Sequence, residues 1–219
     1  LDLGARVSWK ALAEIWATQS PQFAGIVSVF GAPQIRNVGT LGGNIINASP
    51  IADSLPLLHV MHAELELRSA SATRRVDIND FYQDYKCFDL QPGEMLTKVI
   101  LPLPAEAELW RLYKISRRRD FDISSFTSSI RIEREGDTIS SAAIAYGAVG
   151  PTVIRLSQTE AFLTGQTFSE DTMITAGDVA VSEITPISDV RGSADYRYQL
   201  ARNVLLKFYH EQQPAVLVA

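Results

Sequence analysis

The hydrophobic pattern along the chain changes its period several times, and each change predicts a different element. Apolar side chains recur at intervals of three and four residues over positions 9–18 and 53–63, a spacing that places them on one helix face. Ser8 and Asp53 stand at the start of these runs, where a short polar side chain can cap a helix N-terminus. We therefore predict two helices, the first capped by Ser8 and the second by Asp53.

Alternation of apolar and polar residues replaces that spacing at 63–69 and predicts a half-buried strand. We expect a short helical turn at 81–85 and a further strand at 94–104, which ends in the sequence LPLP. Proline lacks the backbone N–H that a strand ladder needs, so the two prolines end that strand. They also mark our predicted boundary between two domains, residues 1–104 and 105–219.

The second half of the chain places its strands before its helices. Three strands are predicted, at 109–116, 124–135 and 138–150, and three helices follow, at 157–165, 170–184 and 193–211. Turn residues around Gly136 join the second and third strands. This order is typical of an α+β fold, here a three-stranded antiparallel sheet with helices on one face.

The composition fits a soluble globular protein, because 46% of the 219 residues are hydrophobic and 21% are charged. The formal net charge is −5. Binding to nucleic-acid phosphates needs a basic excess or a basic stripe, so this charge argues against nucleic acid as a partner. No apolar run has the length needed to span a membrane. We expect a small molecule or another protein as the partner.

Metal chemistry within this chain is not expected. The single cysteine, Cys87, excludes a disulfide within the chain and a thiolate cluster for zinc or iron–sulfur, and it fits a reducing cytoplasm. We expect Cys87 to be a structural thiol. His59 and His62 could share a helix face, but no third metal ligand stands nearby. We therefore predict no metal site, and no side-chain set for hydrolysis can be assembled. The missing initiator methionine indicates a piece of a longer protein.

Residues 40–53, TLGGNIINASPIAD, concentrate the polar chemistry of the chain. The glycines at 42 and 43 permit positive φ and close approach of a ligand, and successive N–H groups in such a turn can bind an anion such as a phosphate. Four short polar side chains that could reach sugar or ribityl hydroxyls follow: Asn44, Asn47, Ser49 and Asp53. The spacing matches neither the dinucleotide fingerprint nor the P-loop, so a capped turn and a nucleotide site both stay open.

The segment FGAPQIRNVGTLGGNIINASPIAD, residues 30–53, is similar to the FAD-binding segment of the xanthine dehydrogenase family of molybdenum hydroxylases. Three further segments resemble motifs of that family in the same order: YKCFDLQPGEML at 85–96, YKISRRRDFDIS at 113–124 and TPISDVRGSADYR at 185–197. The resemblance covers essentially the whole chain.

This resemblance implies an FAD site. It implies that the backbone of five consecutive residues lies along the ribityl and phosphate part of the cofactor: Thr40, Leu41, Gly42, Gly43 and Asn44. By the same matching Asp53 helps to hold the polar chain, Phe30 and Leu96 flank the flavin ring, and Lys114 lies at its polar edge. The arginines at 117–119 could bear on the access of NAD.

The resemblance also implies an arrangement of domains and partners. Residues 1–104 would be the later part of a PCMH-type FAD-binding domain, and residues 105–219 a CO dehydrogenase flavoprotein-like C-terminal domain. Electrons would pass from 2Fe-2S clusters through FAD to NAD during hypoxanthine or xanthine oxidation in purine catabolism. The implied partners are a molybdopterin-binding large subunit and a 2Fe-2S domain, in a cytoplasmic homo- or hetero-oligomer.

Two departures from the family pattern are visible. The earlier half of the FAD domain, with its own glycine-rich loop, is not in this sequence. Lys86 stands where the family carries arginine, which keeps the charge and loses the planar fork. Two alternatives stay open: the flavin subunit of a sister hydroxylase of the CO or aldehyde dehydrogenase type, and an interaction module that has lost its flavin.

Overall fold

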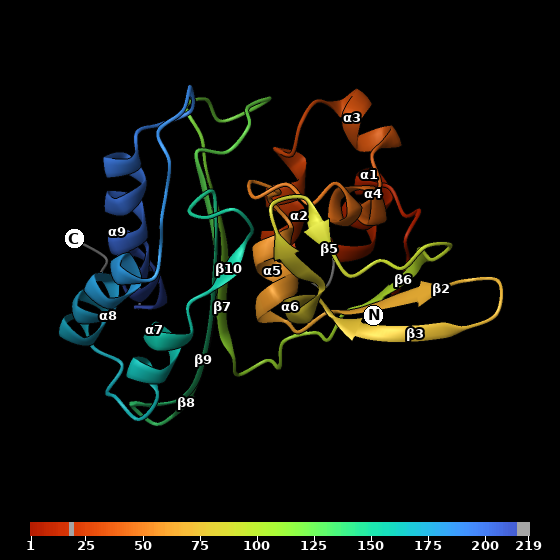
Figure 1. The fold of residues 1–219 in the computed structure, drawn as a ribbon. Helices are drawn as coiled ribbons and strands as arrows, with labels where there is room; N and C mark the ends of the chain where they lie inside the picture. The colour runs from red at the N-terminus through yellow and green to blue at the C-terminus, as the bar shows by residue number, and fades with distance from the viewer. Residues whose placement is uncertain (18–19, 214–219) are drawn as a thin grey trace.

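Two lobes lie side by side, and each is built on its own antiparallel sheet (Figure 1). The structure is a computed structural model and describes residues 1–17 and 20–213. In the first lobe the strand order is β1-β6-β2-β3, with the bounds β1 (Asp2–Gly4), β2 (Glu64–Arg68), β3 (Thr73–Asp77) and β6 (Met95–Ile100). A smaller pair joins β4 (Tyr82–Asp84) to β5 (Cys87–Phe88).

The helices of the first lobe are short and follow one another closely: α1 (Trp9–Trp16), α2 (Pro21–Ser28), α3 (Pro33–Val38), α4 (Leu41–Ile46), α5 (Leu55–Val60) and α6 (Ile78–Phe81). The predicted cap of the first helix is confirmed, because Ser8 Oγ accepts a hydrogen bond from the backbone N–H of Ala11 at 3.2 Å. Position 18 of that predicted helix lies outside the described residues. Helices α2 and α3 were not predicted.

The second lobe confirms the predicted order of strands before helices. Its sheet has the order β10-β9-β8-β7, with the bounds β7 (Leu109–Ile115), β8 (Phe126–Glu135), β9 (Thr138–Gly147) and β10 (Ile154–Arg155). The three predicted helices are α7 (Ser157–Leu163), α8 (Glu170–Ser182) and α9 (Ala194–Gln212). The short strand β10 extends the predicted three-stranded sheet by one strand.

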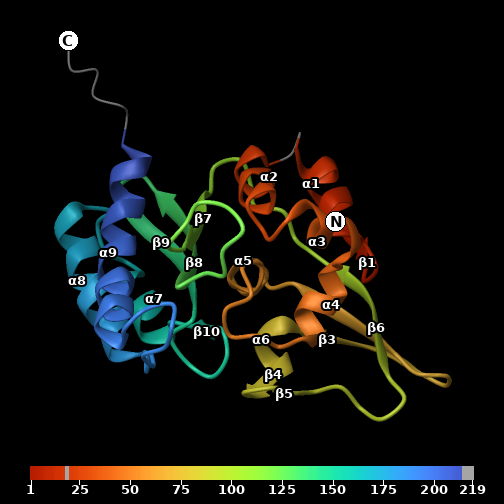
Figure 2. The same cartoon turned by 90° about the horizontal axis from the view of Figure 1, so that it is seen from above.

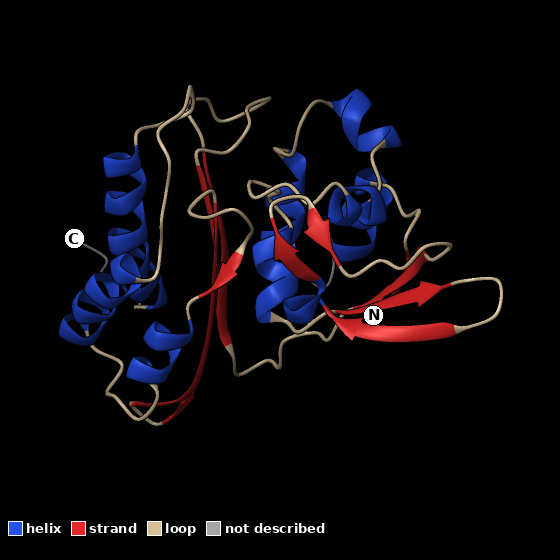
Figure 3. Ribbon diagram, in the orientation of Figure 1, coloured by secondary structure: helices blue, strands red, loops and turns tan. Residues whose placement is uncertain are grey.

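The sheet of the second lobe is buried on both faces. Helices α7, α8 and α9 cover one face, and the first lobe, led by α5, covers the other (Figures 2 and 3). The pleat separates the two faces, since Ile144 and Tyr146 on β9 pack among the helices while the alternating Ala143 and Ala145 pack into the core of the first lobe. The sheet therefore belongs to two hydrophobic cores at once.

Some local predictions are wrong. The helical turn expected at 81–85 is only partly present, because α6 ends at Phe81 and an extended strand, β4, follows it. Cys87 is exposed, contrary to the structural thiol that we expected. Phe81, by contrast, is fully buried and packs in the core of the first lobe.

His59 and His62 connect the two lobes. Arg155 of the second lobe donates to the backbone carbonyl of His59 at 3.2 Å and contacts Nε2 of His62 at 3.1 Å. Burial lowers the pKa of His59 to about 4, and its Nδ1 contacts the side-chain oxygen of Asn79 at 2.9 Å. The described residues contain no group of three or more possible metal ligands. None of the described helices combines the length and the apolar character that crossing a membrane requires.

Candidate functional site

Helix α4 occupies the position where the glycine turn was expected. Thr40 is its N-cap, and the Thr40 Oγ1 accepts a hydrogen bond from the backbone N–H of Gly43 at 3.1 Å. The N–H groups of Leu41 and Gly42 donate to carbonyl oxygens of the segment before α1, at 3.0 and 2.9 Å. These N–H groups are therefore used within the protein, and the segment forms a capped helix where a turn was expected.

The two adjacent glycines have different roles. A Cβ atom at Gly42 would lie 2.7 Å from the Cβ of Ala5 and 2.8 Å from its carbonyl oxygen, so this glycine lets α4 pack directly on the chain before α1. A Cβ atom at Gly43 would meet only the Thr40 Oγ1, at 2.9 Å. Neither glycine has a positive φ. Only Gly43 leaves the helix backbone open to an approaching group.

A cleft of about 260 Å³ lies on one side of α4, and we call it the Asp53 cleft. It gathers several predicted site residues from segments far apart in the sequence: Phe30, Asn44, Asn47, Ser49, Asp53 and Lys114. Apolar side chains complete its wall, among them those of Ile35, Ile51 and Phe121. One part of this cleft is therefore polar and another part is apolar.

A groove of about 300 Å³ lies on the other side of α4, and we call it the Gly43 groove. The predicted residues that line it are Thr40, Gly42, Gly43 and Leu96. Phe30 and Leu96, which we expected to flank one ring, line different hollows. Leu41 lines neither, because its side chain is 1% exposed and packs in the core of the first lobe.

Asp53 forms a buried ion pair instead of the predicted helix cap. The N-cap position of α5 is held by Ser54, which makes no capping side-chain hydrogen bond. The Asp53 carboxylate accepts a hydrogen bond from Lys114 Nζ at 2.6 Å and another from Ser124 Oγ at 2.5 Å. The side chains of Lys114 and Asp53 are 3% and 8% exposed. Because Lys114 and Ser124 belong to the second lobe, this contact joins the two lobes at the cleft.

Two family models match adjoining parts of the chain and together cover nearly all of it. The model for the FAD binding domain in molybdopterin dehydrogenase matches residues 1–104, and the model for the CO dehydrogenase flavoprotein C-terminal domain matches residues 111–212. The chain belongs to the FAD-binding part of the molybdenum hydroxylase family.

Known relatives of this FAD-binding part agree with that membership. Xanthine dehydrogenase 1 of Arabidopsis thaliana is 33% identical over 82% of this chain, which spans 14% of the plant protein. Glyceraldehyde dehydrogenase medium chain of Sulfolobus acidocaldarius is 29% identical over 90% of this chain and 70% of that protein. A solved carbon monoxide dehydrogenase from Hydrogenophaga pseudoflava is 27% identical, with a TM-score of 0.87 over 94% of this chain and 72% of that chain.

The Asp53 cleft of this molybdenum hydroxylase chain fits FAD in its chemistry. A flavin combines a flat apolar ring with a polar edge and a hydroxyl-bearing chain, and the cleft offers apolar walls beside short polar side chains. Asn44 Oδ1 accepts a hydrogen bond from Ser54 at 2.8 Å, and Asn47 Oδ1 accepts one from Lys86 at 3.1 Å. These contacts occupy the amide oxygens and orient the two asparagines, whose NH₂ groups are donors suited to a ligand.

Two larger hollows adjoin the Asp53 cleft. One, of about 460 Å³, shares Asp122 and Ile123 with the cleft and is also lined by Arg117, Arg118 and Arg191. The backbone N–H of Arg118 donates to Asp122 and holds the pKa of that carboxyl below its usual range. The hollow beside the cleft therefore carries both positively and negatively charged side chains at neutral pH.

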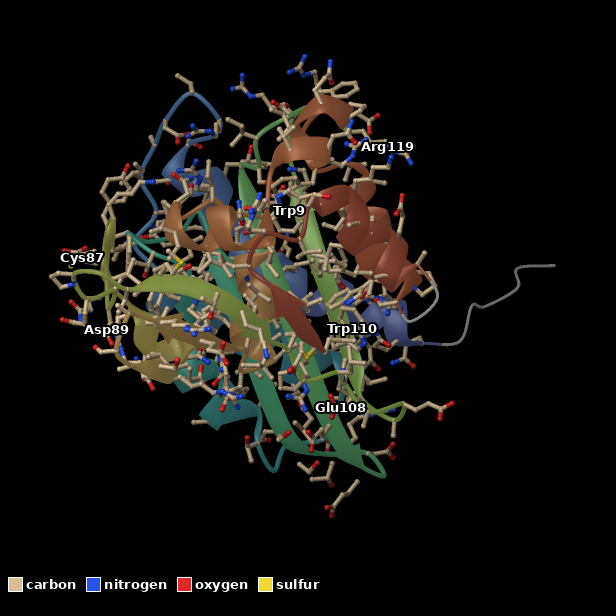
Figure 4. The ribbon with its side chains drawn as sticks, turned by 90° about the vertical axis from the view of Figure 1, so that its right-hand side faces the viewer. Trp9, Cys87, Asp89, Glu108, Trp110 and Arg119 are labelled. Atoms are coloured by element: carbon tan, nitrogen blue, oxygen red, sulfur yellow. The ribbon has the colours of Figure 1, made fainter. Side chains whose placement is uncertain are left out.

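The second hollow, of about 530 Å³, shares Ser49 and Ile51 with the cleft and includes the exposed Tyr85. Arg119 lies at the outer edge of the molecule, at the opposite end of this face from Glu108 and Trp110 (Figure 4). Two members of the predicted arginine run, Arg117 and Arg118, therefore line the hollow beside the cleft, and the third, Arg119, lies at the outer edge.

Proposed function

We propose that this chain holds FAD in the Asp53 cleft and relays electrons from 2Fe-2S clusters through the flavin to NAD, as part of a xanthine dehydrogenase. The observation that carries this proposal is the convergence of three distant segments on one cleft, around the Asp53–Lys114 pair. Both family models and the plant xanthine dehydrogenase support it. When bound, the flavin supplies the electron-transfer chemistry, and the protein supplies position and electrostatics.

We propose that different residues of the two hollows bind different parts of the cofactor. Phe30 contributes an aromatic wall and is itself held by Trp9, whose ring centroid lies 4.5 Å away. Asn44, Asn47 and Ser49 offer short polar groups to hydroxyls of the cofactor. The Gly43 groove would take a further polar part, with Leu96 at its edge. Asp53 and Lys114 would lie against the polar edge of the ring.

NAD is the proposed electron acceptor, and the two hollows beside the cleft are its proposed entry. They join the Asp53 cleft through shared residues, so a molecule bound there would lie next to the flavin. The arginines at 117, 118 and 191 would attract the pyrophosphate of a dinucleotide. Tyr85 offers an exposed aromatic face to a base or a nicotinamide ring.

The proposed partners are a molybdopterin-binding large subunit, which would oxidise hypoxanthine or xanthine, and a domain that carries 2Fe-2S clusters. We place the domain boundary after residue 104, the assembly in the cytoplasm as a homo- or hetero-oligomer, and the reaction in purine catabolism. The chain spans about a seventh of the length of the plant xanthine dehydrogenase, at 14%. The rest of a protein of that length would contain the molybdopterin-binding and 2Fe-2S parts.

The nearest alternative is the flavin subunit of a sister hydroxylase. It is favoured by the share of length that the chain covers in the archaeal medium chain, 70%, and in the carbon monoxide dehydrogenase chain, 72%. These shares are far above the share of the plant enzyme. A module that kept the fold and lost the flavin is the third candidate, and the polar residues retained in the Asp53 cleft argue against it.

The test is a reductive titration of the full-length protein with its partners. The proposed function predicts a yellow protein whose flavin absorbance bleaches on addition of xanthine and returns on addition of NAD. Bleaching by CO or an aldehyde, without bleaching by xanthine, would assign the sister hydroxylase. A colourless protein that takes up no FAD on reconstitution would reject the flavin site altogether.

A further inference from the structure

Ser124 lies at the centre of the polar contacts in the Asp53 cleft. It is 1% exposed and stands between the loop that carries the arginines and strand β8. Its hydroxyl donates to Oδ1 of Asp53 at 2.5 Å and accepts from Nζ of Lys114 at 2.9 Å. A single hydroxyl therefore bonds to both members of the buried ion pair.

The Lys114 ammonium has no N–H left to offer to a ligand. An ammonium carries three donors. In this structure they are directed to Asp53 Oδ2 at 2.6 Å, to Ser124 Oγ at 2.9 Å and to the backbone carbonyl of Asp122 at 3.0 Å. Any new hydrogen bond from Lys114 would break one of these contacts.

Asp53 has the opposite capacity. Each carboxylate oxygen accepts one hydrogen bond here, from Lys114 or from Ser124, and each can accept a second. Asp53 is also among the residues that line the cleft, and its side chain is more exposed than that of Lys114, at 8% against 3%. Of the two charged groups in the ion pair, Asp53 is the one able to bond a molecule in the cleft without rearrangement.

We propose that Ser124 is a positioning residue for the flavin. Its hydroxyl fixes the Asp53 carboxylate as the hydrogen-bond acceptor for the ring and keeps Lys114 turned away from the ring. This inference rests on the proposed function, in which FAD occupies the Asp53 cleft. Ser124 therefore determines which of the two charged groups, Asp53 or Lys114, forms a hydrogen bond with the ring.

The consequence is a tuned reduction potential. Reduction adds negative charge to a flavin, and a carboxylate at its edge disfavours that charge while an ammonium N–H favours it. Removing the Ser124 hydroxyl frees one Lys114 N–H and leaves Asp53 Oδ1 without its donor, so the two charged groups can pair more closely and the carboxylate is no longer held as an acceptor for the ring. Ser124→Ala should therefore raise the midpoint potential of the bound FAD, and Ser124→Thr, which keeps a hydroxyl, should restore the wild-type potential.

The experiment measures the midpoint potential of FAD in the full-length protein by spectroelectrochemical titration, with FAD content determined from the absorbance. The matched control is Ser129→Ala, because Ser129 is buried on β8 and its hydroxyl bonds to a backbone carbonyl, that of Arg111, at 3.2 Å. A raised potential in Ser124→Ala alone supports the inference. An unchanged potential in Ser124→Ala with FAD bound, or an equal rise in Ser129→Ala, overturns it.

Two further outcomes keep the inference separate from the proposed function. Wild-type protein that takes up no FAD defeats the proposed function, whereas wild-type protein with FAD and an insensitive potential defeats only the role of Ser124. If Ser124→Ala loses its cofactor, Ser124→Cys provides the decisive measurement, because a thiol is a weaker donor. A potential above wild type in that variant supports the inference, and a wild-type potential overturns it.

Discussion

The two hollows beside α4, the Asp53 cleft and the Gly43 groove, are formed by different kinds of contact. The Asp53 cleft is formed by residues of both lobes around a buried ion pair, whereas the Gly43 groove lies within the first lobe and combines two glycines of α4 with larger side chains such as Leu90 and Leu96. The cleft therefore depends on how the lobes dock, and the groove depends on how α4 packs. We therefore expect mutations in the cleft and mutations in the groove to have different effects on stability and on FAD retention.

The largest expected effect comes from breaking the ion pair on the cleft side. Lys114→Met leaves the Asp53 carboxylate buried without its cation, and the loss of one partner in a buried pair costs about 3–5 kcal/mol of unfolding free energy. Denaturant unfolding followed by circular dichroism measures the change. The control is Lys98→Met, whose pair with Asp2 is solvent-exposed, at 35% and 64%, and should change stability little. Equal losses in both variants would contradict a special role for the cleft pair.

On the groove side the comparison is between neighbouring glycines. Gly42→Val places side-chain atoms against the backbone of Ala5 and should cost about 1–3 kcal/mol of unfolding free energy through overpacking. Gly43→Val meets only the cap side chain of Thr40, so it should leave the fold largely intact and weaken FAD retention by blocking the groove. Thermal melting and flavin content separate the two effects. If Gly43→Val keeps its full FAD content at wild-type affinity, the groove takes no part of the cofactor.

Acidification should lower the stability of the protein through His59, which lies on α5. Burial lowers the pKa of His59 to about 4 in the folded protein, below the ordinary value of 6.5. The unfolded chain therefore binds more protons between these values, and stability falls as the pH drops from 6.5 towards 4. At pH 5 the expected loss is about 2 kcal/mol or less. Unfolding curves at pH 7 and pH 5 measure it, and a His59→Gln variant should lose this component of the pH dependence.

The smallest effect should lie outside both the Asp53 cleft and the Gly43 groove, in the rate of the last electron transfer. Arg118→Glu reverses one charge beside the Asp53 cleft, and the side chain of Arg118 is 72% exposed, so folding should not change. With NAD as the acceptor, as proposed above, we expect flavin reoxidation to slow by roughly threefold to tenfold, because the local concentration of an anionic dinucleotide falls. Stopped-flow measurement of flavin reduction by xanthine provides the internal control, since that step should keep its rate. An unchanged reoxidation rate would remove the loop from the acceptor site.

The sequence predicts the second lobe better than the first, for a physical reason. Strands β8 and β9 have 10 residues each and helices α8 and α9 have 13 and 19, so their length makes the type of element easier to predict. Helices α2 and α3 have 8 and 6 residues and begin with proline, so the pattern resembles that of turns. Tertiary packing, which a local pattern does not contain, stabilises them.

Several residues that the resemblance selected line one cleft in the structure, and their role towards a flavin stays a prediction. The motif resemblance selected Asp53 and Lys114, and the structure places them in contact. It did not predict that Asp53 would bond to Lys114 and Ser124 in place of a helix terminus. Ser124 lies 71 positions away from Asp53 in the sequence. Such a contact forms only when the lobes dock, so capping preference alone gave the wrong answer for this residue.

The burial of both faces of the second lobe's sheet also bears on whether the gene can be divided between the two lobes during evolution. Because its inner face forms part of the core of the first lobe, a gene split between the lobes would leave each product with an apolar surface in water. The two halves should then unfold in one cooperative transition. Genetic rearrangement would be expected to move them together, even where neighbouring parts of the enzyme are encoded as separate subunits.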